Sequence, residues 1–160
     1  MMPSIEILKL MHVLGAAVLF GTGAGIAFFM LMARRTRDPH LIAHVAGTVV
    51  IADALFTATA VVAQPVTGLL LAYVAGWPLT EGWILVSLGL YVLVGALWLP
   101  VVAIQMRLRR LAETAAREHR SLPDQYNRLF RIWFWCGWPA FAGVLAIFWL
   151  MLTKPAIPLL

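Results

Sequence analysis

The residue whose chemistry best suits a metal or cofactor site is His12, which lies inside the first long apolar run. A neutral imidazole can ligate haem iron or another metal ion. Gly15 follows about one turn later on the same face of a helix, so a flat ring could lie against the backbone there. The spacing therefore makes His12 a candidate metal ligand, and makes His12 and Gly15 candidate haem b-binding residues. The alternative is that His12 hydrogen-bonds a neighbouring helix.

Gln64 and Tyr91 occupy other apolar runs at depths comparable with that of His12. We expect them to line an outer pocket beside a haem. Their polar groups would also serve the carbonyls of a quinone, which is the alternative cofactor. The other histidine inside an apolar run is His44, at the start of the second run. In the predicted topology this position lies on the opposite side of the membrane from His12. A haem in one chain would therefore use a single histidine, a non-histidine sixth ligand, or His12 from a second copy.

Asp53 is an acidic residue inside an apolar run, where a carboxylate costs about 2.5 to 3.5 kcal/mol on insertion scales. Arg131 begins the last apolar run at a similar predicted depth. The sequence therefore predicts a structural ion pair between Asp53 and Arg131. The alternative is that Asp53 handles protons.

The elements that must position these residues are membrane-spanning helices. The chain is 62% hydrophobic and 12% charged, and its mean hydropathy is +0.90. Four apolar runs each exceed the roughly 20 residues that span a bilayer as a helix. They cover residues 5–32, 41–74, 83–105 and 130–152. We therefore expect an all-α, four-helix transmembrane bundle formed by two hairpins within one domain, residues 1–160.

The positive charges are confined to two of the three predicted loops. Nine of the twelve Lys and Arg residues lie between the first and second runs or between the third and fourth, and a tenth, Arg131, lies at the very start of the fourth. This distribution predicts two basic cytoplasmic loops, with both termini outside a bacterial inner membrane. The same topology accounts for the net charge of +5, so nucleic acid is not an expected partner. The third run is expected to continue as a basic amphipathic helix near the inner leaflet, and residues 121–124 to begin the last helix.

Polar, small or aromatic residues recur every three or four positions in each run, which gives each helix one distinctive face. In the second and third runs these residues are Asp53, Thr57, Ala60, Gln64, Thr67, Ser87, Tyr91, Gly95, Trp98 and Gln105. The faces could simply pack the four helices together, or they could enclose a cofactor. Gly21 and Gly25 form a GxxxG pattern, which also favours contact with another membrane helix.

Five segments carry a resemblance to known proteins. They are LKLMHVLG (8–15), ADALFT (52–57), QPVTG (64–68), WLPVV (98–102) and GWPAF (137–141). Through them nearly the whole chain resembles a bacterial family of four-span integral membrane proteins described as a domain of unknown function. The first helix is also distantly similar to those of the HemJ-type protoporphyrinogen oxidases and the CopD-like copper proteins. The HemJ resemblance implies haem b ligated at His12, but here Met11 precedes the histidine and the third run has no lysine.

These observations lead to one main functional hypothesis and several alternatives. The main hypothesis is a small membrane protein that binds haem b or a porphyrin through His12, with a redox or electron-transfer role. The first alternatives are a quinone-binding protein and a non-enzymatic accessory subunit or assembly factor, whose partner is another membrane protein or a second copy. A transporter with Asp53 as proton carrier is a further alternative. No zinc cluster, nucleophile elbow or phosphate loop assigns a catalytic residue.

Overall fold

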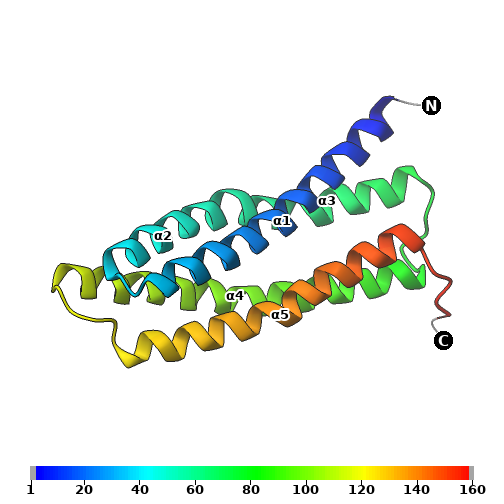
Figure 1. Ribbon diagram of the computed structural model, residues 1–160. Helices are drawn as coiled ribbons and strands as arrows, with labels where there is room; N and C mark the ends of the chain where they lie inside the picture. The colour runs from blue at the N-terminus through cyan, green and yellow to red at the C-terminus, as the bar shows by residue number, and fades with distance from the viewer. Residues whose placement is uncertain (1–2, 159–160) are drawn as a thin grey trace.

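The computed structural model describes residues 3–158, and within that range it contains helices and no strand. The elements are α1 (Pro3–Thr36), α2 (Pro39–Ala52), the π-helical segment η1 (Asp53–Thr57), α3 (Ala58–Val74), α4 (Gly82–Arg117) and α5 (Asp124–Thr153). Because α2, η1 and α3 are continuous, they form one long span. Four helices are thus long and apolar enough to cross a membrane, and the predicted four-helix fold is confirmed (Figure 1).

Local sequence signals explain where the helices end on the side predicted to be cytoplasmic. Asp38 caps α2 by accepting a hydrogen bond from the His40 backbone N–H at 2.9 Å, and Pro39 occupies the first turn. Helix α5 begins at Asp124 directly after Pro123, as predicted. Helix α4 continues to Arg117, as predicted. Leu108 and Ala112 of this extension are completely buried, because they pack in the core shared with α2 and α5.

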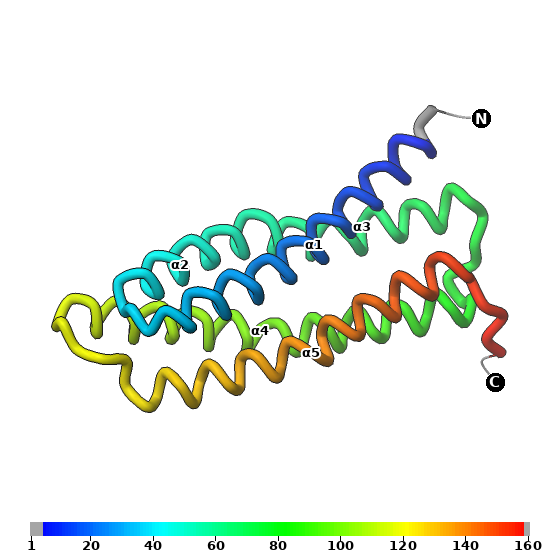
Figure 2. The backbone as a smooth tube through the Cα atoms, viewed as in Figure 1, coloured from blue at the N-terminus to red at the C-terminus, as the bar shows by residue number. Residues whose placement is uncertain are grey.

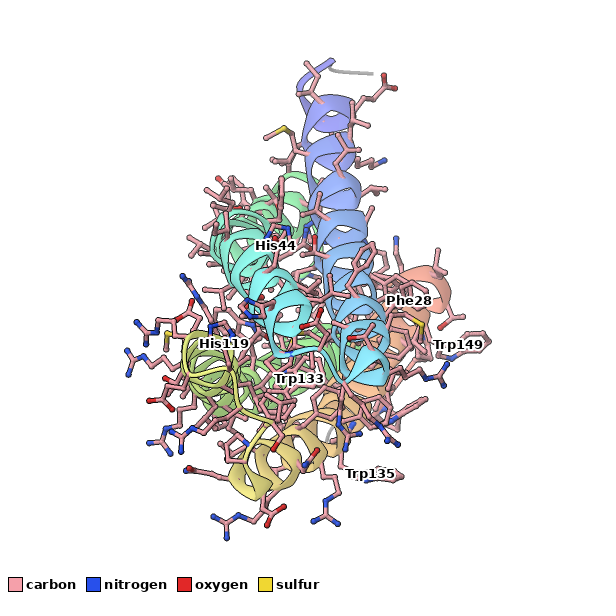
Figure 3. All side chains as sticks on the ribbon, turned by 60° about the vertical axis from the view of Figure 1, so that its left-hand side comes forward. Phe28, His44, His119, Trp133, Trp135 and Trp149 are labelled. Atoms are coloured by element: carbon pink, nitrogen blue, oxygen red, sulfur yellow. The ribbon has the colours of Figure 1, made fainter. Side chains whose placement is uncertain are left out.

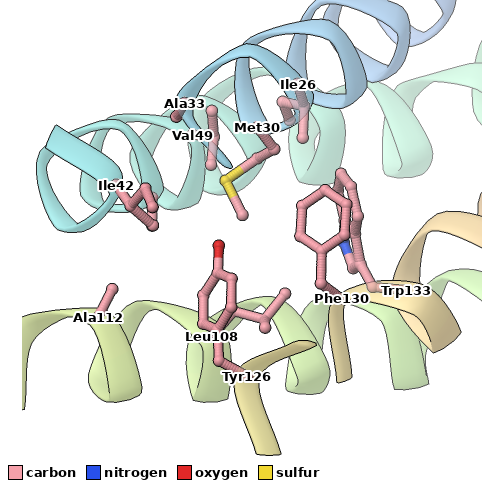
Figure 4. Close-up of a cluster of buried hydrophobic side chains, with 11 residues drawn as sticks. Ile26, Met30, Ala33, Ile42, Val49, Leu108, Ala112, Tyr126, Phe130 and Trp133 are labelled. Atoms are coloured by element: carbon pink, nitrogen blue, oxygen red, sulfur yellow. The ribbon is translucent and has the colours of Figure 1, made fainter. Parts of the chain in front are cut away.

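The main apolar core lies at the end of the bundle that carries the two basic loops, the end predicted to be cytoplasmic. The largest of its completely buried side chains include Met30, Ile42, Tyr126 and Phe130, which come from three of the long helices and meet beside α4 (Figure 4). Arg34 links α1 to α5 at the same end. Its guanidinium donates to Asn127 Oδ1 at 3.2 Å and lies 4.6 Å from the ring centroid of Phe130. The inner half of the four-helix bundle is therefore closely packed.

The outer half is divided into two helix pairs. Helix α1 packs along α3, while α4 packs along α5. In Figures 1 and 2 these two pairs diverge towards the end where the N- and C-termini lie. A smaller apolar cluster, formed by Trp83, Ile84 and Leu150, holds α4 to α5 there. The inner core is thus shared by all four helices, whereas the outer half leaves space between the pairs.

Large apolar side chains cover the outside of the bundle. Phe28, Trp135 and Trp149 point away from the helices (Figure 3), and each side chain is more than half exposed. The amino-terminal turns of α1 project from the bundle and expose Leu10 and Val13 in the same way. An apolar surface of this extent is expected of a protein surrounded by lipid.

Candidate functional site

His12 bridges α1 and α3. Its Nδ1 lies 2.8 Å from Thr67 Oγ1, and the Thr67 hydroxyl also lies 2.8 Å from the carbonyl oxygen of Ala63. If the single hydroxyl hydrogen is donated to that carbonyl, then Nδ1–H of His12 donates to the hydroxyl oxygen. The ring rests on Gly68, where an added Cβ would lie 3.1 Å from His12 Cε1. The interpretation of His12 as a residue that hydrogen-bonds a neighbouring helix is confirmed.

A second polar contact runs in the opposite direction between the same helices. Gln64 Nε2 of α3 donates to the backbone carbonyl oxygen of His12 at 2.8 Å. The amide passes directly over Gly15, where a Cβ would collide with it. Gln64 therefore covers the Gly15 face that the sequence led us to expect bare, and the binding of a porphyrin at Gly15 stays a prediction.

Tyr91 of α4 reaches across to α3 and compensates for a proline. Pro65 has no N–H, so the carbonyl of Val61 four residues earlier lacks its helical partner. The Tyr91 hydroxyl donates to that Val61 carbonyl oxygen. This contact satisfies a backbone group that would otherwise be unpaired in the membrane interior.

Asp53 is 7% exposed and begins the π-helical segment. Its Oδ1 accepts a hydrogen bond from Trp98 Nε1 of α4 at 3.4 Å. The predicted ion pair with Arg131 is not formed. Arg131 is exposed and lines a groove on the outside of α5. The only salt bridges among residues 3–158 lie elsewhere, one in the last turns of α4 and one in the loop that follows it. Asp53 is thus a buried acid without a basic partner in the described part of the chain.

Thr57 ends the π-helical segment one turn after Asp53. Its side chain is 4% exposed, and its hydroxyl makes no hydrogen bond of good geometry among the described residues. The Asp53 side chain, one turn earlier, is within its reach as an acceptor. Most threonines in membrane helices donate to a carbonyl in the preceding turn, as Thr59 does to Leu55 at 2.6 Å. Thr57 therefore retains a hydrogen-bond donor in the interior of the bundle.

These polar groups share a cavity of about 380 Å³ between the two helix pairs. Its polar lining consists of Asp53, Thr57, Gln64, Tyr91, Trp98 and Gln105. The rest of the wall is apolar, and much of it is aromatic: Phe20, Trp133, Phe134, Trp138 and Phe141. Within the described chain, no lysine, arginine or histidine lines the cavity, and His12 lies outside it.

The predicted polar faces of the helices line the cavity, but only two of the four predicted cofactor residues do so. Gln64 and Tyr91 both line it, whereas His12 and Gly15 remain in the contact between α1 and α3. No group of three metal-ligating side chains occurs in the part of the chain that the structure describes. Three further residues line the cavity, although the sequence assigned them only to the inward faces and not to the cofactor site: Thr57, Trp98 and Gln105. Their positions on the same helix faces as Gln64 and Tyr91 are the signal in the sequence that could have identified them.

The GxxxG pattern is not used for packing within this chain. An added Cβ at Gly21 would meet no described atom within 4 Å, and one at Gly25 would meet only Phe29 of its own helix. Its contact with another membrane protein or a second copy stays a prediction.

Comparison with protein families places nearly the whole chain in one of them. Residues 6–155 match the family described as "Predicted integral membrane protein (DUF2269)". Neither the comparison with curated proteins nor that with solved structures finds a match. The family match covers all four spans of the structure. The chain therefore belongs to this family of predicted integral membrane proteins.

Proposed function

We propose that this membrane protein binds a small, flat, conjugated dicarbonyl compound of the quinone class in the cavity between its helix pairs. The observation that carries the proposal is the buried Thr57 hydroxyl, which lines an aromatic-walled cavity and makes no hydrogen bond of good geometry among the described residues. The one acceptor within its reach is the buried Asp53 side chain, and a ligand carbonyl in the cavity would give the hydroxyl a better-placed partner.

The composition of the cavity also supports a neutral, flat and mostly apolar ligand. Its volume of about 380 Å³ falls in the usual range for small-molecule sites, which combine apolar walls with few polar groups. Gln64 uses one amide hydrogen on the His12 carbonyl and keeps a second. Tyr91 is committed to the Val61 carbonyl, so Gln64 is the better second donor. A bound quinone would supply reversible redox chemistry, while these residues would orient its ring.

Replacing Thr57 with valine tests the role of the hydroxyl. Valine keeps the shape but removes the donor, so we expect a short-chain quinone to bind about threefold to tenfold more weakly. The unliganded variant should be at least as stable as the wild type, because a poorly paired buried group is lost. Saturable quenching of tryptophan fluorescence in lipid nanodiscs measures the affinity, and thermal unfolding measures the stability.

Thr59→Val is the matched control, because Thr59 is exposed and its hydroxyl donates within its own helix. It should leave quinone affinity unchanged. Equal losses in Thr57→Val and Thr59→Val would contradict the proposal. So would saturable binding of a lipophilic cation such as tetraphenylphosphonium in place of the quinone, because the ligand would then be selected by the Asp53 charge.

Haem b binding through His12 is a second candidate, supported by the orientation of the imidazole. Donation from Nδ1–H to Thr67 leaves Nε2 with a free lone pair, the arrangement typical of metal-ligating histidines. The histidine thus suits haem iron, but Gln64 covers the Gly15 face against which a porphyrin would lie. A haem bound to Nε2 would supply one-electron redox chemistry.

Absorption spectra of protein purified from its native membrane test this candidate. A Soret band that shifts on reduction is expected, and His12→Ala should remove it. The control is His44→Ala, since His44 is exposed and lies near the start of α2. A folded, colourless wild-type protein would rule out the haem, as would a band that survives in His12→Ala.

A further inference from the structure

A second concave site lies on the lipid-facing side of α5, remote from the cavity. It is a groove of about 620 Å³, and Leu97 of α4 is part of its wall. The remainder comes from one face of α5, where Arg128 and Arg131 are followed by Ile132, Trp135 and Pro139. These residues recur every three or four positions, so basic side chains occupy one end of the groove and apolar side chains continue it along the helix.

The two arginines are available to an external anion. Both are exposed, and neither forms a salt bridge with a carboxylate among residues 3–158. They lie three residues apart near the start of α5, so their side chains are neighbours on one face of the helix. An arginine guanidinium matches the geometry of a phosphate group and can bind it through two hydrogen bonds.

The predicted orientation puts this basic end at the inner leaflet of the membrane, where anionic lipids are found. The apolar end extends into the hydrocarbon region: Pro139 lies eight residues beyond Arg131, or about 12 Å along the helix axis. Trp135, between them, is 68% exposed. A free phosphate ion would leave this apolar end uncovered, whereas a phospholipid has an acyl chain to cover it.

We propose that this groove is a binding site for an anionic phospholipid. Arg128 and Arg131 hold the lipid phosphate, and an acyl chain lies against Ile132 and Trp135. The proposal is independent of the ligand in the central cavity, because the residues that line the two sites are different.

Native mass spectrometry of protein released from nanodiscs containing equal amounts of phosphatidylglycerol and phosphatidylcholine tests the proposal. The wild type should retain phosphatidylglycerol in preference to phosphatidylcholine. In Arg128→Gln/Arg131→Gln that preference should fall by at least about tenfold, because the guanidinium hydrogen bonds to the lipid phosphate are lost. Thermal unfolding in neutral detergent should show both proteins folded.

The matched control is Arg107→Gln/Arg110→Gln. These arginines are also exposed and three residues apart, but they lie on α4 outside the groove. This control should keep the preference for phosphatidylglycerol. Equal losses in the two double variants would overturn the proposal, because they would show a general charge effect. Displacement of the lipid by inorganic phosphate alone, or retention of both lipids equally by the wild type, would also overturn it.

Discussion

Gly95→Leu is expected to abolish saturable quinone binding without destabilising the bundle. Gly95 lines the central cavity, and an added Cβ would meet no described atom within 4 Å. A leucine side chain can therefore occupy the space that the ligand needs. Glycine also costs about 1 kcal/mol relative to alanine inside a helix, so the substitution should not lower stability. We expect affinity to fall by more than about tenfold, measured by tryptophan quenching in nanodiscs.

Gly89→Leu controls for a general effect of adding leucine to α4. Gly89 lies on the same helix, is exposed, and also has open space around it among the described residues. Quinone binding should be retained in this variant. If Gly95→Leu binds the quinone as tightly as the wild type does, the ligand does not occupy the cavity.

Gly15→Ala is expected to lower the free energy of unfolding by about 1 to 3 kcal/mol, the usual cost of overpacking. The new methyl group would overlap the Gln64 amide, so Gln64 would have to leave the His12 carbonyl. Gly21→Ala is the control, since Gly21 is exposed and an added Cβ there meets none of the described atoms. Equilibrium unfolding in mixed detergent micelles measures both variants.

The proposed cause can be separated from a general intolerance of alanine at position 15. Gln64→Ala removes the overlapping amide, so Gly15→Ala should cost less when added to Gln64→Ala than when made in the wild type. This is a double-mutant cycle, and it isolates the contact between the two side chains. Identical costs in the two backgrounds would show that Gly15 does not act through Gln64.

The sequence was sufficient to predict the helices and the faces that they turn inward. Hydropathy indicated four spans, and the spacing of Asp53, Thr57 and Gln64 predicted one shared face, which now lines the cavity. Depth alone did not predict the partner of Asp53. Arg131 is at a similar predicted depth but is turned outward on α5, while Trp98 of α4 supplies the hydrogen bond. The rotation of each helix depends on tertiary packing, which periodicity within one helix does not determine.

Two other features of the site also depend on contacts between helices. The π-helical segment that places Asp53 and Thr57 has no distinctive composition, so its extra residue per turn could not be read from propensities. The glycines near His12 suggested an open face. Whether a glycine accommodates a cofactor or a side chain depends on the facing helix, and here Gln64 fills the position beside Gly15.

Photoaffinity labelling with an azido-quinone, mapped by mass spectrometry, tests the central claim most directly. The account predicts adducts on cavity residues from separate helices, such as Phe20, Tyr91 and Phe141, and it predicts that excess unlabelled quinone and Gly95→Leu both suppress them. Adducts confined to exposed residues such as Leu10 and Val92, unaffected by competitor, would contradict it. They would show that the quinone only dissolves in the lipid around the protein.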